Sequence, residues 1–168
     1  KKIGLLVFVL IINASCQESE ESSFDKFGVS FICPRGWQVV EEEPLEDDYG
    51  YYLALEKEGF DSSGLVAIMW LKDIVAHKEV IDMQINELKS QLTHKNLKSG
   101  QITKGNFNDL NSQVLEFSFS LIGIPHNGKV YCFHDNQRTY LIFMQEAIED
   151  NAVNKDGFEL IEKSFQLK

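Results

Sequence analysis

The sequence predicts an α+β protein whose sheet is mostly antiparallel. Strand-like runs are followed by a helical pattern, then by further strands and a second helix, which is the element order of this class. Neighbouring strands are separated by short turns, and short turns join antiparallel strands. Residues 65–71 and 138–145 are apolar on both strand faces, so they are expected inside the sheet with cover on both sides.

The amino terminus has the pattern of a secretory signal peptide. Lys1 and Lys2 precede an apolar run over residues 3–12, which match the charged and apolar regions of such a peptide. Ten helical residues rise about 15 Å, half of the roughly 30 Å hydrocarbon core, so the run is too short to cross a bilayer. We therefore expect residues 1–15 to be a signal peptide that is removed on export.

A lipid attachment site is expected directly after this peptide. Residues 13–16 read Asn-Ala-Ser-Cys and resemble the lipobox of bacterial lipoproteins, in which small residues precede the lipidated cysteine. Asn13 stands where leucine is usual, a relaxation familiar among lipoproteins of the Bacteroidetes. The resemblance implies that lipid on Cys16 anchors the chain in the bacterial cell envelope, and we expect the outer membrane. The alternative is a soluble periplasmic protein that is cut nearby.

The mature chain is expected to be a tethered single domain. Cleavage before Cys16 leaves 153 residues with a formal charge of −12, because two lysines are lost. Residues 16–23 are polar and acidic and are expected to form a flexible tether. They resemble a surface-export signal of Bacteroidetes lipoproteins. A solvated linker that faces the periplasm is an alternative of the same weight. Residues 24–168 contain no repeat or second linker, which predicts one globular domain.

Four strands are expected before the first helix. Pro34 and Pro44 end the first two, and the polar residues 46–50 and 61–64 supply turns between the others. The expected strands cover residues 27–33, 38–43, 51–57 and 65–71.

The second half of the domain is expected to hold two helices around a set of strands. Apolar residues recur at helical spacing over residues 74–92, with Asp73 as the N-cap. Asn127 and Gly128 are a strong signal for a type I′ hairpin turn. Asp156 and Glu159 have the spacing of a capping box and are expected to begin the last helix. The strands between the helices are expected at residues 101–107, 114–122, 129–134 and 138–145.

Two segments resemble PsbP-like domains. The first is Phe27-Gly-Val-Ser-Phe31 followed by Pro34-Arg-Gly-Trp37, and the second is residues 157–165. The superfamily includes a photosystem II extrinsic subunit, a Ran-binding nuclear import factor and bacterial envelope lipoproteins. The resemblance implies a sheet of about seven strands with helices on both faces, an α/β/α sandwich. It implies no particular reaction, because function depends on sites and not on the fold.

The sequence contains no catalytic, cofactor or metal framework that we recognise. It has no glycine-rich phosphate loop and no Gly-x-Ser-x-Gly element. Its 26 acidic and 16 basic residues, a formal charge of −10, disfavour a nucleic-acid partner. The acidic run at residues 41–48 lacks the spacing of a calcium loop. His126 and His134 are expected on opposite strands of one hairpin, without the spacing of a zinc site.

The sequence therefore favours a non-catalytic module that binds a protein or a small molecule. The expected surface lies within residues 41–52, where acidic residues adjoin tyrosines, a residue type common at interfaces. The negative charge favours a basic partner and salt-sensitive association. The alternative function is an envelope hydrolase that uses carboxylates from several loops. The candidate binding residues are Glu42, Glu46, Asp47, Asp48, Tyr49, Tyr51 and Tyr52.

Two cysteines remain for the folded domain. Cys33 shares a strand face with Val29 and Phe31, and Cys132 shares one with Val130, so both thiols are expected to be buried. An exported protein meets an oxidising compartment, where an even number of thiols permits a disulfide. Two free buried thiols are the default expectation, and a Cys33–Cys132 disulfide is the alternative.

Overall fold

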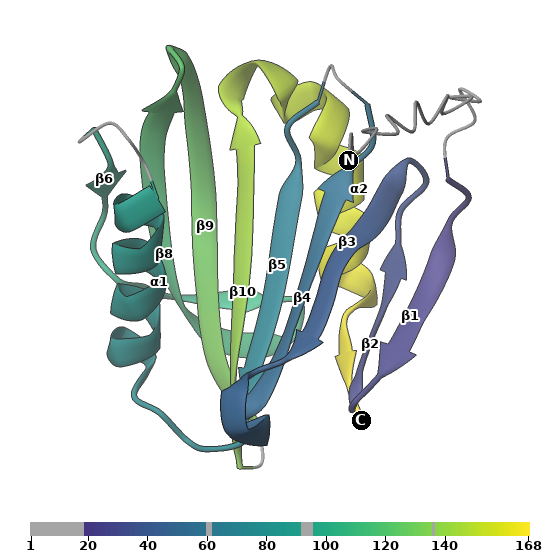
Figure 1. The fold of residues 1–168 in the computed structure, drawn as a ribbon, viewed down its shortest axis with the longest axis vertical. Coiled ribbons are helices and arrows are strands. Elements are labelled where there is room, and N and C mark those ends of the chain that lie inside the picture. The colour runs from purple at the N-terminus through teal and green to yellow at the C-terminus, as the bar shows by residue number, and fades with distance from the viewer. Residues whose placement is uncertain (1–18, 60–61, 92–95, 136) are drawn as a thin grey trace, which may run out of the picture.

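The computed structural model describes residues 19–59, 62–91, 96–135 and 137–168. The expected signal peptide and Cys16 lie outside the described residues. Among the helices in the described ranges, none combines the length and the apolar character needed to cross a membrane. The large sheet is the main feature of the fold (Figure 1).

The large sheet has eight strands, and every neighbouring pair is antiparallel. Seven strands follow the order β3-β4-β5-β10-β9-β8-β6, and β7 also pairs with β8. The fold is thus α+β with a mostly antiparallel sheet of about seven strands, as the sequence predicts. Its strands are β3 (Trp37–Pro44), β4 (Gly50–Lys57), β5 (Leu65–Leu71), β6 (Lys98–Ser99), β7 (Thr103–Phe107), β8 (Leu110–Leu121), β9 (Ile124–Asp135) and β10 (Arg138–Ala147).

A second, three-stranded sheet was not predicted. It has the order β1-β2-β11 and is formed by β1 (Ser22–Lys26), β2 (Val29–Cys33) and β11 (Gln166–Leu167). The expected flexibility of residues 16–23 is therefore wrong for Ser22 and Ser23, which pair with β2. Ser19 is also attached to the domain, because its Oγ donates a hydrogen bond of 2.9 Å to the carbonyl of Trp37.

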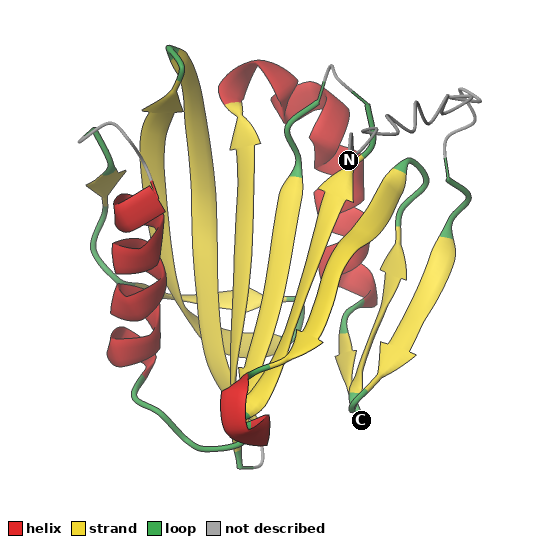
Figure 2. Cartoon of the chain, in the orientation of Figure 1, coloured by secondary structure: helices red, strands yellow, loops and turns green. Residues whose placement is uncertain are grey.

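One helix covers each face of the large sheet (Figure 2). Helix α1 (His77–Gln91) packs with Val80, Ile81 and Leu88 against one face. Helix α2 (Asn151–Ser164) and the small sheet cover the other face. Short 3-10 helices η1 (Glu46–Asp48) and η2 (Ile148–Asp150) complete the elements. This arrangement confirms the prediction of helices on both faces.

The starts of both helices differ from the prediction. Helix α1 does not begin at Asp73, because the amides of Glu79 and Val80 both donate to the carbonyl of Ala76. The carbonyl of Asp73 instead accepts a hydrogen bond from Thr139 Oγ1 at 2.8 Å, which holds this segment along β10. Helix α2 begins before the expected capping box, so Asp156 lies inside the helix.

The expected hairpin turn at Asn127 and Gly128 is also wrong. Both residues lie inside β9, and the turn from β8 to β9 occurs at Ile122 and Gly123, whose φ angles are 50° and 84°. Two successive positive φ angles are the requirement of a type I′ turn. The structure therefore has these two positive φ angles at Ile122 and Gly123, five residues before the predicted position.

Candidate binding groove

A surface groove lies between the β1–β2 turn and one end of the central strands of the large sheet. It has a volume of about 1100 Å³ and is bounded by β4, β5, β10, the β1–β2 turn and the C-terminal residue. We call it the aromatic groove, because aromatic side chains form its floor. They are Phe27, Tyr51, Trp70 and Tyr140.

Strand register places three of these side chains in one row. Tyr51 on β4 is directly opposite Trp70 on β5, and Trp70 is directly opposite Tyr140 on β10. Directly opposed residues share a face of the sheet. The rings of Tyr51 and Trp70 are stacked, with centroids 5.0 Å apart and planes 25° apart. The three side chains thus form one aromatic row across three strands, in which Trp70 and Tyr140 are buried.

Phe27 extends this surface from the small sheet. Its ring centroid lies 4.2 Å from that of Tyr51, and its side chain is 54% exposed. Phe27 and Gly28 connect β1 to β2 with φ angles of 55° and 85°. A positive φ is unfavourable for a residue with a Cβ atom. Phe27 therefore places an apolar ring in solvent on a strained turn, which is unusual for a residue with a purely structural role.

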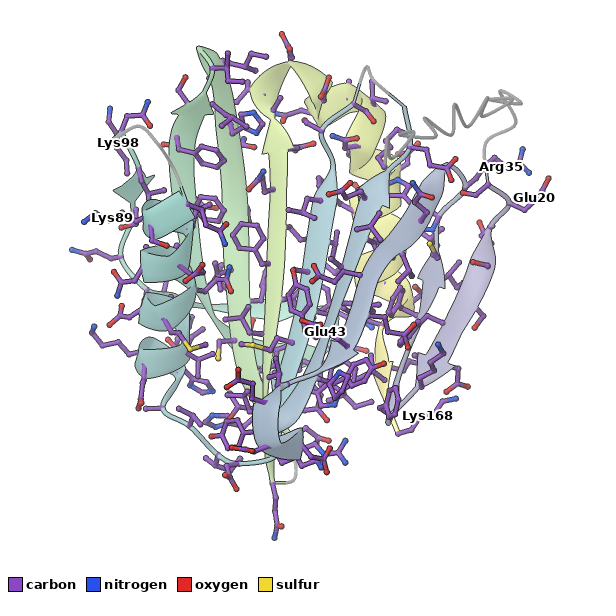
Figure 3. All side chains as sticks on the ribbon, viewed as in Figure 1. Glu20, Arg35, Glu43, Lys89, Lys98 and Lys168 are labelled. Atoms are coloured by element: carbon purple, nitrogen blue, oxygen red, sulfur yellow. The ribbon has the colours of Figure 1, made fainter. Side chains whose placement is uncertain are left out.

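The rim of the groove carries three cations and two carboxylates. The cations are Lys72, Arg138 and Lys168, and the carboxylates are Asp48 and Asp135. Lys72 forms an ion pair with Asp48, and Figure 3 shows Lys168 beside the small sheet. Lys168 is in turn paired with Asp25, so with Asp25 counted the rim has an even balance of positive and negative side chains. This balance differs from the acidic surface that the sequence predicted.

Arg138 fixes the turn that presents Phe27. Its Nη1 donates a hydrogen bond of 3.1 Å to the carbonyl of Phe27. The amide of Lys168 donates to the carbonyl of Gly28 at 2.9 Å. Residues more than one hundred positions apart in the chain therefore hold one end of the groove.

Glu42 is part of this region, but it is already paired. Its carboxylate accepts hydrogen bonds from Lys26 Nζ at 2.8 Å and from the hydroxyl of Tyr51 at 2.8 Å. These contacts, that of Lys26 first, lower the pKa of Glu42. Burial and the hydrogen bond to Glu42 raise the pKa of Tyr51. Glu42 therefore orients the ring of Tyr51 rather than presenting a free carboxylate.

The structure places some of the predicted binding residues at the aromatic groove and the others elsewhere. Asp48 and Tyr51 line the aromatic groove, and Glu42 contacts it through Tyr51. Tyr52 points to the opposite face of the sheet and packs with the α1 core, where burial raises its pKa. Tyr49 is 41% exposed. Tyr49, Glu46 and Asp47 do not line the aromatic groove.

The histidines do not form the arrangement expected from the sequence. His126 and His134 both lie on β9, not on opposite strands. His126 stacks on Phe119, with centroids 5.0 Å apart, and His134 stacks on His77, with centroids 3.8 Å apart. In the described ranges, no group of three or more His, Cys, Asp or Glu residues is placed to hold a metal ion.

Both cysteines of the domain are buried and free. Cys33 belongs to the core beneath α2 and the small sheet, and Cys132 belongs to the core beneath α1. The large sheet separates these two cores. The structure therefore contains no disulfide between Cys33 and Cys132.

Comparison with solved structures identifies the class of fold. The chain resembles LpqN of Mycobacterium tuberculosis, described as involved in cell envelope biogenesis, with a TM-score of 0.52 and 13% identity over 89% of this chain and 91% of LpqN. It also resembles the cyanobacterial PsbP of Synechocystis, with a TM-score of 0.59 and 10% identity over 89% of this chain and 92% of that protein. The chain thus has the PsbP-like fold. No family model and no curated protein sequence matches it.

Proposed function

We propose that the chain is a lipid-anchored protein of the bacterial cell envelope whose domain binds a partner without catalysing a reaction. The lipobox-like residues 13–16 support attachment through Cys16, in the outer membrane. The similarity to LpqN, which is described as involved in cell envelope biogenesis, supports an envelope location. The partner is a protein or a small molecule.

The observation that carries the binding role is the aromatic groove. Grooves that bind ligands are concave, largely apolar, and carry a few polar groups that orient the ligand. Here the rings of Phe27, Tyr51 and Trp70 contact one another, Tyr51 and Trp70 stacked and Phe27 tilted against both, and charged side chains also line the groove. Of these rings Phe27 is exposed and Tyr51 is partly exposed, and aromatic side chains are among those that contribute most at binding surfaces.

The hydrolase alternative gains no comparable support. A hydrolase of this kind requires two carboxylates or an acid and a histidine directed at one reacting atom. Of the two carboxylates of the aromatic groove, Asp48 is paired with Lys72, and no histidine is among the described residues that line the groove with Asp48 and Asp135. The contact between His77 and His134 lies outside this groove. We therefore propose a binding module.

Lipid attachment is tested with the Cys16→Ala variant of the full-length chain in a bacterial host. The wild type should incorporate labelled palmitate and sediment with the membranes. The variant should incorporate no label and appear in the soluble fraction. An unlabelled wild type, or a variant that stays in the membrane, would contradict lipid anchoring at Cys16.

Binding at the aromatic groove is tested by site-specific photo-crosslinking in cells. A photoreactive phenylalanine analogue replaces Phe27, which is 54% exposed, or Met83 on α1, which is 49% exposed. Light should produce a defined adduct from position 27 and not from position 83. Identical adduct patterns from both positions would show that Phe27 marks no binding site.

A further inference from the structure

A second groove lies between helix α2 and the strands β8, β9 and β10. Its volume is about 440 Å³, within the range of about 300–1,000 Å³ typical of small-molecule sites. Helix α2 lies behind the sheet in Figure 1 and forms one wall. We call this feature the helix groove. It shares no lining residue with the aromatic groove.

The helix groove has apolar walls. Phe158 contributes from α2, and Met144 and Tyr131 contribute from β10 and β9. Register places Met144 directly opposite Lys129, and Tyr131 lies two residues further along β9 on the same face. These side chains form a surface that fits the hydrocarbon part of a ligand.

Acidic residues outnumber basic residues along the groove. Four glutamates line it, at positions 116, 146, 159 and 162, against Lys129 and Lys155. Glu116 is paired with Lys129 at 2.9 Å, and Glu159 is 3.8 Å from Lys155. The two basic residues of the groove are thus already paired. No cation in the described part of the chain lies within ion-pair distance of Glu146.

Glu146 carries an unsatisfied oxygen at the groove. Its Oε2 is buried and has no hydrogen-bond partner. Leaving a buried carboxylate oxygen without a partner costs free energy. Glu146 as a whole is only partly buried; burial raises the pKa of its carboxyl group, and hydrogen bonding with the side chain of Asn154 opposes this rise to a smaller extent. A bound cation that donates a hydrogen bond would satisfy this oxygen and neutralise the charge.

We propose that the helix groove binds a small molecule with a protonated amine attached to an apolar body. The ammonium group would donate to Glu146 Oε2, and the apolar body would lie against Phe158 and Met144. The carboxylate distinguishes this ligand from alcohols and acids of the same shape, because only the ammonium provides a positive charge. The proposal is independent of the function proposed for the aromatic groove.

The proposal is tested with three ligands that share a phenyl ring and a short chain. They are phenethylamine, phenethyl alcohol and 3-phenylpropionate, which carry one positive charge, no charge and one negative charge. Each is titrated into the ¹⁵N-labelled domain while amide chemical shifts are recorded. The amine should cause saturable shifts at Glu146, Asn151 and Lys155. It should bind at least tenfold more tightly than the alcohol, and the acid should not bind.

A pair of variants separates Glu146 from the net charge of the protein. Glu146→Gln keeps the shape of the side chain and should remove the preference for the amine over the alcohol. Glu43→Gln removes the same charge on the α1 side of the sheet and should leave the preference unchanged. Equal binding of amine and alcohol to the unmodified protein would overturn the proposal without any variant. Shifts confined to the aromatic groove, or a preference that survives Glu146→Gln, would overturn it as well.

Discussion

Gly157 lies directly against the indole ring of Trp37. A Cβ atom at position 157 would be 2.5 Å from Trp37 Nε1 and 2.7 Å from Cε2. This contact joins the middle of α2 to the first residue of β3, and Trp37 is only 2% exposed. Glycine is therefore required where the helix crosses the ring, although glycine is unfavourable inside a helix.

The Gly157→Ala variant should be less stable than the wild type. The greater helix propensity of alanine favours the variant by about 1 kcal/mol. The added methyl group overpacks a rigid buried ring, which costs about 1–3 kcal/mol, so destabilisation should prevail. Gly100→Ala is the control for the added methyl group alone, because Gly100 lies outside the helices and its Cβ would be 3.5 Å from the nearest atom. Urea unfolding measures both, and equal stability of the two variants would contradict the close contact.

The stability of the domain should fall as the pH is lowered from 7 to 5. Burial lowers the pKa of His77 and of His126, and the charge of His134 contributes for His77. A lowered pKa means that the unfolded chain binds protons more readily, so stability is lost as the pH falls below about 6.5. The double variant His77→Gln with His126→Gln should flatten this dependence in urea titrations. An unchanged slope would contradict the assignment to these histidines.

The positions of β3, β4, β5 and β10 followed from the sequence, because strand periodicity depends on local patterns. Residues 65–71 are apolar on both faces and form β5 over the same residues. The Asn127–Gly128 signal failed because tertiary packing explains this glycine better than turn formation. A Cβ at Gly128 would be 2.3 Å from Phe117 Cζ and 2.4 Å from the carbonyl oxygen of Met144.

The part of the candidate site that depends on neighbouring segments of the chain could also be predicted. Tyr51 and Glu42 lie on adjacent strands joined by a short loop, so their proximity was within reach of the sequence. Phe27 and Arg138 are 111 residues apart, and only the position of β1–β2 beside β10 brings them together. The turn at Phe27 could not be predicted, because the residues Phe-Gly-Val-Ser-Phe alternate as they would in one continuous strand.

The Gly128→Ala variant should be strongly destabilised. The methyl group would meet a buried aromatic ring on one side and the backbone of β10 on the other, and the backbone cannot move without breaking the sheet. The expected loss is about 2–3 kcal/mol, at the upper end for overpacking. Gly123→Ala should cost less, about 1 kcal/mol, because it only places alanine at a positive φ. Thermal unfolding of both variants compares the losses, and the reverse order would favour a turn at residues 127 and 128.

The two thiols of the folded domain should be slow to react. Burial raises the pKa of Cys132 to about 12 and also raises that of Cys33. Only the thiolate reacts, so at pH 8 about one Cys132 thiol in ten thousand is reactive even when accessible. In the Cys16→Ala background, a chromogenic disulfide reagent should label no thiol in the native protein within minutes. It should label two thiols after denaturation without reductant, and labelling of none at that step would indicate a disulfide.

Two replacements of Phe27 separate the effect of its backbone conformation on stability from the effect of its ring on binding. Phe27→Ala removes the tilted ring contact with Tyr51 and keeps a Cβ atom at a φ of 55°. Phe27→Gly removes the same ring and also relieves the left-handed backbone, which is worth about 1 kcal/mol. The glycine variant should therefore be more stable than the alanine variant by about this amount in urea unfolding. Both variants should lose partner binding equally, because both lack the ring that extends the floor of the aromatic groove. Equal stability of the two variants would contradict the positive φ at Phe27, and unchanged binding in both would exclude the ring from the binding surface.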